Sequence, residues 1–181
     1  MKYEVVITSG KSNQAPIGAF LKGDLVTLHL YEGSHTFENL QKDKFYILNT
    51  CSPYLIAKSV LDDSGDYEYL DKNGEKIPYL TDSFKVELIE IQNRKIVETK
   101  NEFGSSKLMI VEGKPIFEKI LNCNTTPYNR ADGAIVEMAV LYSRKCMISK
   151  EELKEEMDKL MKIIKKVGGT KYIELAKKLG V

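Results

Sequence analysis

Hydrophobic residues in the first two thirds of the chain fall in short runs that are separated by turn residues, as in antiparallel β proteins. These runs predict β-strands at residues 2–8, 14–21, 25–31, 45–49, 84–91, 95–99, 107–111 and 115–121. The run at 84–91 alternates strictly between apolar and polar residues, so one face of this strand is expected to meet water. The run at 25–31 is apolar on both faces, as in a strand buried on two sides. Strands at such short spacing are expected to close into a barrel.

Helical spacing of apolar residues appears where the β pattern stops. It predicts short helices at 36–42 and 54–61 and longer helices at 129–145, 149–167 and 170–179. Residues 62–82 are acidic, rich in tyrosine and interrupted by Asn73-Gly74 and Pro78, which predicts an irregular loop long enough to form a lid. Glu112-Gly113 is expected to be a turn. The sequence therefore predicts a mainly β domain at 1–125 and a helical extension at 126–181 that packs on the barrel.

Charge and cysteine content narrow the functional classes. Lys and Arg number 27 against 26 for Asp and Glu, so no net field draws the chain to nucleic acid or an anionic membrane. No apolar run approaches the roughly 20 residues that cross a bilayer, and the N-terminus is too strand-like for a signal peptide, so a cytoplasmic location is expected. Three cysteines without a C-x-x-C pair are expected to be buried thiols, and two histidines exclude a His-rich metal site.

The first candidate binding segment lies at the start of the second predicted strand. It consists of Asn13, Gln14, Ala15, Pro16, Ile17 and Gly18, which carry little side-chain bulk. One interpretation is an edge strand that Pro and Gly simply mark. The other is a surface on which a planar ring lies against bare backbone, whose N–H and C=O groups meet the polar edge of the ring.

The second candidate segment is a Gly-Ser-x-Thr turn that leads into the predicted helix at 36–42. Its candidate ligand-binding residues are Gly33, Ser34, His35, Thr36 and Asn39. Ser34 or Thr36 can serve as an ordinary helix cap. Alternatively, their hydroxyls and the free backbone amides can hold a phosphate at the helix start. A flat ring beside a phosphate describes a flavin nucleotide, and the two segments together make this the leading hypothesis.

Three further residues are candidate ligand contacts, and each has an ordinary structural role as an alternative. Arg130 suits bidentate phosphate recognition but can also pair with Glu137. Asn129 stands beside it at a predicted helix start, and Asn49 either ends its strand or contacts a ligand. No Ser-His-Asp or Cys-His-Asn set can be assembled, so any reactive chemistry is expected to belong to a bound cofactor.

Several of these motifs occur together in one known family. The run Glu4–Thr8, the segment Asn13–Gly18, the segment Gly33–Leu40 and the run Ile47–Asn49 resemble the archaeal family DUF447. Asn129-Arg130-Ala131, Glu137 and Gly168-Gly169 are also similar to that family, so the resemblance covers essentially the whole chain.

This resemblance implies an antiparallel Greek-key split β-barrel of the flavin reductase-like, FMN-binding kind, with a helical C-terminal extension. It implies FMN as cofactor, held near the interface of a homodimer, and no metal. Asn13 to Gly18 would line the isoalloxazine ring, and Ser34, Thr36 and Asn39 would hold the phosphate and ribityl end. Arg130 would neutralise phosphate charge.

The function implied is that of an FMN-dependent oxidoreductase that moves hydride or electrons through the flavin, with NAD(P)H or a deazaflavin as donor. Two alternatives stay open, a non-catalytic flavin carrier or sensor and a split barrel that binds the deazaflavin F420. The resemblance gives no physiological substrate.

Overall fold

The computed structural model describes residues 2–61, 66–101, 104–123 and 129–180. The chain divides into two units, each with its own core. One unit is formed by Met1–Cys51 and Ser64–Cys123, and the other by Ser52–Asp63 and Asn124–Val181. The second unit thus takes up a short segment from the middle of the chain, which the sequence-based division at residue 125 assigned to the barrel.

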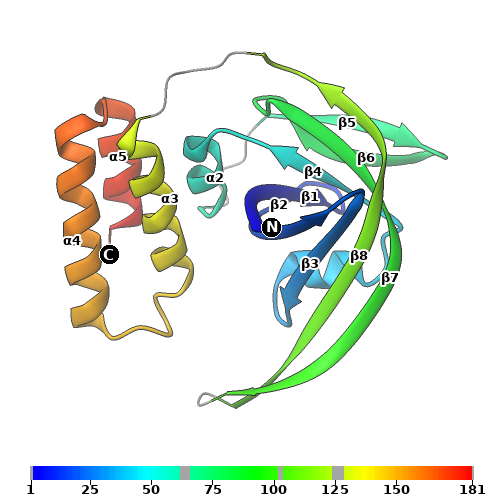
Figure 1. Ribbon diagram of the computed structural model, residues 1–181, viewed down its shortest axis with the longest axis horizontal. Coiled ribbons are helices and arrows are strands. Elements are labelled where there is room, and N and C mark those ends of the chain that lie inside the picture. The colour runs from blue at the N-terminus through cyan, green and yellow to red at the C-terminus, as the bar shows by residue number, and fades with distance from the viewer. Residues whose placement is uncertain (1, 62–65, 102–103, 124–128, 181) are drawn as a thin grey trace. The chain divides into compact units, whose positions relative to one another are not determined.

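Six antiparallel strands close the barrel within the described residues (Figure 1). They are β1 (Lys2–Ser9), β2 (Asn13–Lys22), β3 (Leu25–Tyr31), β4 (Phe45–Thr50), β7 (Lys85–Asn101) and β8 (Gly104–Ile120). Their order around the barrel is β1-β2-β3-β8-β7-β4, and the short helix α1 (His35–Leu40) connects β3 to β4. The expected antiparallel barrel is confirmed.

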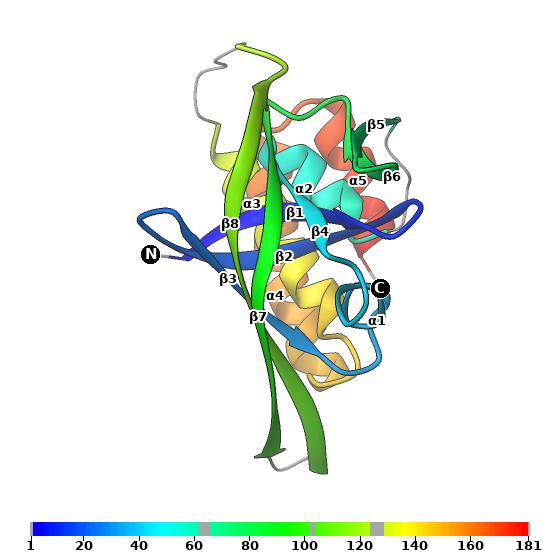
Figure 2. The same ribbon diagram turned by 90° about the vertical axis from the view of Figure 1, so that its right-hand side faces the viewer.

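The last two barrel strands are longer than the sequence predicts. Four predicted strands between 84 and 121 merge into β7 and β8, each of 17 residues, which run side by side as one curved ribbon (Figure 2). Register shifts between Leu88 and Ile89 and between Ile91 and Asn93 mark bulges, which let a strand bend without ending. The predicted turn at Glu112-Gly113 is wrong, because Gly113 lies inside β8 and faces both Val26 of β3 and Ile91 of β7.

A β-hairpin replaces most of the predicted irregular loop. Its strands are β5 (Tyr67–Lys72) and β6 (Glu75–Leu80), joined by Asn73-Gly74 with φ values of 56° and 83°. Positive φ at both central residues is the geometry of the tightest hairpin turns, and Asn-Gly is its strongest sequence signal. The loop prediction is therefore wrong over these strands; Pro78 is tolerated because β6 pairs with β5 alone in this two-stranded sheet.

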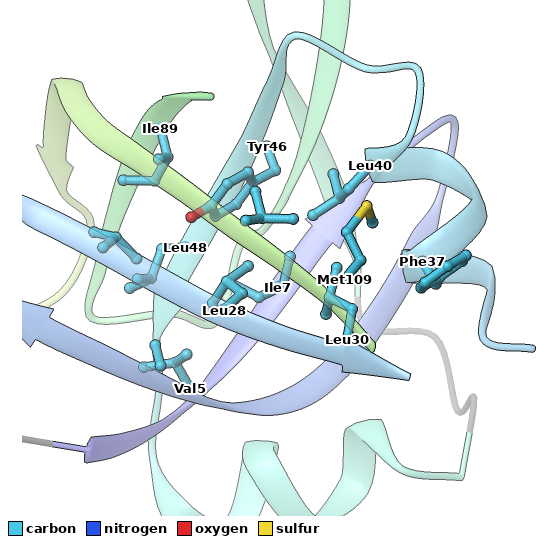
Figure 3. Packing of buried hydrophobic residues seen from close by; sticks show 13 residues of the cluster. Val5, Ile7, Leu28, Leu30, Phe37, Leu40, Tyr46, Leu48, Ile89 and Met109 are labelled. Carbon is cyan, nitrogen blue, oxygen red and sulfur yellow. The ribbon is translucent and has the colours of Figure 1, made fainter. Parts of the chain in front are cut away.

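Apolar side chains fill the barrel and also lie between the barrel wall and the hairpin. Tyr46 and Leu48 of β4 point into the barrel, where they meet Ile7, Leu28 and other core residues (Figure 3). The alternate residues of β4 pack on the outer side in a second cluster, which consists of Phe45, Ile47, Ile77, Tyr79, Val86 and Leu88. Strand β4 is thus buried on both faces. The Tyr46 hydroxyl is buried without a hydrogen-bond partner among the described residues, and burial raises its pKa.

Four helices make up the described part of the second unit: α2 (Pro53–Ser59), α3 (Arg130–Ser143), α4 (Lys150–Val167) and α5 (Thr170–Leu179). Their apolar faces share one core, to which Ala57 of α2, Met138 of α3 and Ile164 of α4 contribute. Side-chain oxygens of Ser52 and Ser149 cap the starts of α2 and α4, as short polar residues commonly do. Within the described ranges, no helix combines the length and apolar character needed to cross a membrane.

Candidate functional site

Two polar segments that the sequence marks separately meet at one end of the barrel. The Asn13 Nδ2 group donates hydrogen bonds to Ser9 Oγ at 3.1 Å and to Thr36 Oγ1 at 2.9 Å. The Asn39 Nδ2 group donates to the same Ser9 oxygen at 3.2 Å. We call these four residues the Ser9 cluster. It joins the β1–β2 turn to α1, so the structure brings together Asn13, Thr36 and Asn39 as the flavin hypothesis requires.

The backbone at the β1–β2 turn is shaped to admit this cluster. Gly10 has a φ of +58°, and a Cβ atom built on it would lie 2.7 Å from Asn39 Nδ2. The Gly10 amide donates to Asp43 Oδ2 at 3.0 Å, which fixes the turn to the segment after α1. A residue with a side chain at position 10 would both strain the backbone and displace the Asn39 amide.

The strand segment next to the Ser9 cluster has small side chains of its own, and the Lys2 side chain lies against it at Gly18. Ala15, Pro16, Ile17 and Gly18 are all half-buried, and Ile17 packs against the barrel core. A Cβ atom on Gly18 would meet the Lys2 side chain at 1.8 Å. Because Lys2 is a long, half-exposed side chain, it can turn away from the strand. The segment therefore offers a narrow strip of accessible backbone.

The turn before α1 is exposed, and one of its side chains caps the helix. Ser34 Oγ accepts a hydrogen bond from Phe37 N at 3.1 Å and donates to Tyr31 O at 3.2 Å, so Ser34 caps the helix. Gly33 has a φ of +91° and open space around it. His35 is exposed and its Nδ1 lies 3.9 Å from the Glu38 carboxylate. The cap interpretation of Ser34 is thus satisfied, and its exposed hydroxyl still faces solvent.

Asn49 has a structural role. It is fully buried, and its Nδ2 group donates to Val6 O and Thr8 Oγ1, both at 3.0 Å. Its Oδ1 atom accepts from Leu80 N at 3.0 Å and from Ser83 Oγ at 3.4 Å. The Asn49 amide therefore joins β1, β4 and the end of β6, and all of this bonding is internal to the protein.

Asn129 and Arg130 belong to the helical unit. Asn129 caps α3 by accepting a hydrogen bond from Ala131 N at 2.9 Å, and its backbone amide donates to Asp132 Oδ2 at 3.1 Å in a reciprocal capping box. Its Nδ2 group also donates to Val167 O at 3.0 Å. Arg130 is exposed at the first position of α3. The structural interpretation of Asn129 is thus supported, while the guanidinium of Arg130 meets solvent.

Sequence reasoning missed Ser9 and Gly10, which it assigned only to a turn. A signal was present, because Val5, Ile7 and Ser9 occupy alternate positions of β1 and alternate residues share one face of a strand. Val5 and Ile7 fill the barrel core, so Ser9 is the residue at which this inward face becomes polar. A fully buried serine at that position needs hydrogen-bond partners, which Asn13 and Asn39 supply.

The three cysteines lie in different environments, which leads to a prediction about their reactivity. Cys51 is buried against Asn49 O and Ser83 Oγ, and desolvation raises the pKa of its thiol to about 12. At pH 8 only about one Cys51 thiol in ten thousand is then ionised. Cys123 and Cys146 are exposed, so the expectation of three buried thiols is wrong for these two.

We expect a thiol reagent such as 5,5′-dithiobis(2-nitrobenzoate) to label two cysteines rapidly at pH 8 and the third only on unfolding. The thiolate is the reactive species, so Cys51 should stay inert up to about pH 10. Peptide mass mapping identifies the labelled sites, and a Cys51→Ser variant serves as control by keeping the same rapid count of two. Rapid labelling of Cys51 in the folded protein would contradict this account.

Comparison with known proteins identifies relatives along the whole chain. A family model described as the N-terminal domain of the DUF447 proteins of unknown function matches residues 3–122, and its C-terminal counterpart matches residues 129–180. The chain is 43% identical over 183 residues to an uncharacterized protein of Methanocaldococcus jannaschii. The alignment covers 96% of this chain and 93% of the relative.

Solved structures share the fold. The FMN-bound DUF447 protein MM1853 of Methanosarcina mazei has a TM-score of 0.81 at 24% identity and covers 98% of this chain and 93% of its own. A flavoredoxin of Methanosarcina acetivorans has a TM-score of 0.50 at 11% identity, covering 65% and 67% of the two chains. The flavin reductase of styrene monooxygenase from Pseudomonas putida has a TM-score of 0.50 at 10% identity, covering 71% and 94%. These likenesses confirm the split-barrel fold.

Proposed function

This chain belongs to the DUF447 family, and from that premise we propose that it is an FMN-binding protein whose barrel unit carries the flavin beside the Ser9 cluster. The observation that carries the proposal is the meeting of β2 and α1 through Ser9, Asn13, Thr36 and Asn39. The FMN-bound DUF447 protein of Methanosarcina mazei, which has the same fold, supports the choice of ligand.

The residues present fit the parts of a flavin nucleotide. The half-buried strip from Ala15 to Gly18 presents accessible backbone to the flat ring. The backbone at Gly33 has open space around it, and the exposed Ser34 hydroxyl can bind the phosphate by exchanging the hydrogen bond that it donates to Tyr31 O. Lys107 forms an ion pair with Glu32, the residue before Gly33, at 3.2 Å. The assignment of Arg130 to the phosphate stays a prediction.

A redox function follows from the chemistry of the cofactor. When bound, FMN supplies reversible hydride and electron transfer at its ring, while the protein supplies binding and orientation. We propose that the chain is an oxidoreductase with NAD(P)H or a deazaflavin as electron donor. Steady-state turnover with a donor and an artificial acceptor tests this, and a single reduction without turnover would instead show a flavin carrier.

Removing the hydroxyl groups of Ser34 and Thr36, at the turn before α1, should abolish tight FMN binding. In the double variant Ser34→Ala/Thr36→Ala, the turn loses its exposed hydroxyl and Asn13 loses one of its two acceptors. The lost bond to the charged phosphate contributes roughly 1.5–3 kcal/mol and the lost neutral bond of Asn13 roughly 0.5–1.5 kcal/mol, so we expect the Kd for FMN to rise about 100-fold. Titration of flavin fluorescence measures this change.

A matched control separates a local effect from a general one. Ser12→Ala/Thr27→Ala removes the same atoms from the β1–β2 turn and from β3, outside the proposed contacts, and should leave the Kd within about twofold. An unchanged Kd in the Ser34/Thr36 variant, with both variants folded by circular dichroism, would show that the phosphate assignment is wrong.

We propose further that the protein is a homodimer. Strand β8 exposes Ile116, Phe117 and Ile120, with exposed fractions of 41%, 47% and 65%. Neighbouring apolar side chains at such exposure are typical of surfaces that another protein covers. Light scattering on the eluting protein should give twice the mass of the chain, and the Phe117→Glu variant should shift it to the mass of one chain. A monomeric mass for the wild type would refute this proposal.

A further inference from the structure

In the structure, the side-chain amides of Asn13 and Asn39 turn their nitrogens toward the hydroxyl groups of the Ser9 cluster. Asn13 Nδ2 has two hydrogens, and both are used, one by Ser9 Oγ and one by Thr36 Oγ1. With both N–H groups bonded to protein acceptors, the carbonyl oxygen is the only group of the Asn13 amide that is left for a ligand. Asn39 donates to the other lone pair of the same Ser9 oxygen, which orients its amide in the same sense.

The carbonyl oxygens of these two amides are acceptors that the protein leaves available. Among the described residues, no hydrogen bond reaches Asn13 Oδ1 or Asn39 Oδ1, and neither atom is among those buried without a partner. Both side chains are half-buried, so their oxygens lie at the surface of the site. By contrast, Ser9 and Thr36 are almost completely buried and cannot reach a ligand themselves.

Two fixed acceptors select one part of a flavin nucleotide. A phosphate dianion has only acceptor oxygens, so a carbonyl oxygen beside it repels it. The ribityl chain carries hydroxyl groups, each of which can donate a hydrogen bond. The oxidised ring offers a single donor, its imide N–H, which cannot satisfy both oxygens.

We propose that Asn13 and Asn39 bind the ribityl hydroxyls of the flavin through their side-chain oxygens, and that buried Ser9 and Thr36 are positioning residues that hold both amides in this orientation. The inference rests on the proposed FMN function and deepens it. It moves Asn13 from the ring to the ribityl chain and assigns Asn39 to that chain and not to the phosphate, and it makes a hydroxyl-rich chain a requirement for binding.

The test compares ligands that differ in one part. FMN and riboflavin share the ring and the ribityl chain, and only FMN has the phosphate. Without Ser9 Oγ, both amides are free to rotate, so Ser9→Ala should raise the Kd for both ligands by the same factor, about tenfold. Because neither of the two amides contacts the ring, the visible absorption spectrum of bound FMN should stay unchanged. Ser12→Ala, in the same turn, is the control and should leave both Kd values unchanged.

Each other outcome overturns the proposal in a distinct way. A loss for FMN alone would place the amides at the phosphate, and an altered ring spectrum would place them at the ring. Unchanged affinities would show that Ser9 does not position them. Thr36→Val removes the other acceptor of Asn13 and keeps the side-chain shape. It should raise both Kd values by the same factor and leave the spectrum unchanged, and it serves as the test if Ser9→Ala fails to fold. Failure of the wild type to bind any flavin would instead refute the proposed function itself.

Discussion

Replacing Asn49 by alanine is expected to lower the free energy of unfolding by about 3–5 kcal/mol, a large share of the stability of a typical domain. The Asn49 amide holds β1 through Val6 O and Thr8 Oγ1 and holds the end of β6 through Leu80 N. These groups are buried, so without the amide each one loses a hydrogen bond without gaining water, although Thr8 Oγ1 keeps the bond that it donates to Pro78 O. An unsatisfied buried polar group costs roughly 1–3 kcal/mol.

Chemical denaturation monitored by circular dichroism measures this loss. Asn93→Ala is the matched control, because Asn93 is exposed and makes one side-chain bond, to Glu112 Oε2 at 3.2 Å. The control should change stability by less than about 0.5 kcal/mol. A similarly small effect of Asn49→Ala would contradict the structural role and return Asn49 to the list of ligand contacts.

Gly113→Ala is expected to destabilise the barrel by about 2–4 kcal/mol. Gly113 lies where β8 faces both β3 and β7, next to the bulge in β7. A Cβ atom there would lie 2.6 Å from Ile89 Cγ2 and 2.8 Å from the Glu90 carbonyl oxygen. The backbone of β7 cannot yield as a flexible side chain would, so the strands must separate.

Gly23→Ala provides the comparison for Gly113→Ala. Gly23 has a φ of +60° but open space around it, so a methyl group adds only the backbone strain of about 1 kcal/mol. Gly113 has no positive φ, so a destabilisation by Gly113→Ala larger than that by Gly23→Ala reports the steric contact. Equal destabilisation in thermal or denaturant unfolding would show that β8 does not pass as close to β7 as the structure places it.

The barrel could be predicted because its strands carry their own periodicity. The apolar run of β4 follows from its burial on both faces. The expectation that β3 is buried on two sides is wrong, because burial alternates along this strand and His29 and Tyr31 are exposed. The hairpin at Asn73-Gly74 was also visible in principle, but Pro78 and the acidic residues favoured a loop. Gly113 was taken for a turn because glycine has the same local signature in a turn and at a close approach of two strands.

The candidate site was only partly predictable, because its hydrogen bonds join residues that lie far apart in the sequence. Asn13, Thr36 and Asn39 stand out as polar residues between apolar runs, and they do meet. Their connection through Ser9 depends on a contact between residues 30 positions apart, which no local pattern reports. Asn49 shows the converse, since a polar residue after a strand looks like a ligand contact until its buried partners are known.

We propose above that this chain binds FMN in its barrel unit. The absorption spectrum of the purified protein tests this most directly, together with mass spectrometry of what the protein releases on denaturation. We expect a flavin spectrum and the mass of FMN, either as purified or after added FMN is taken up at one molecule per chain. A colourless protein that also fails to bind added FMN would contradict it.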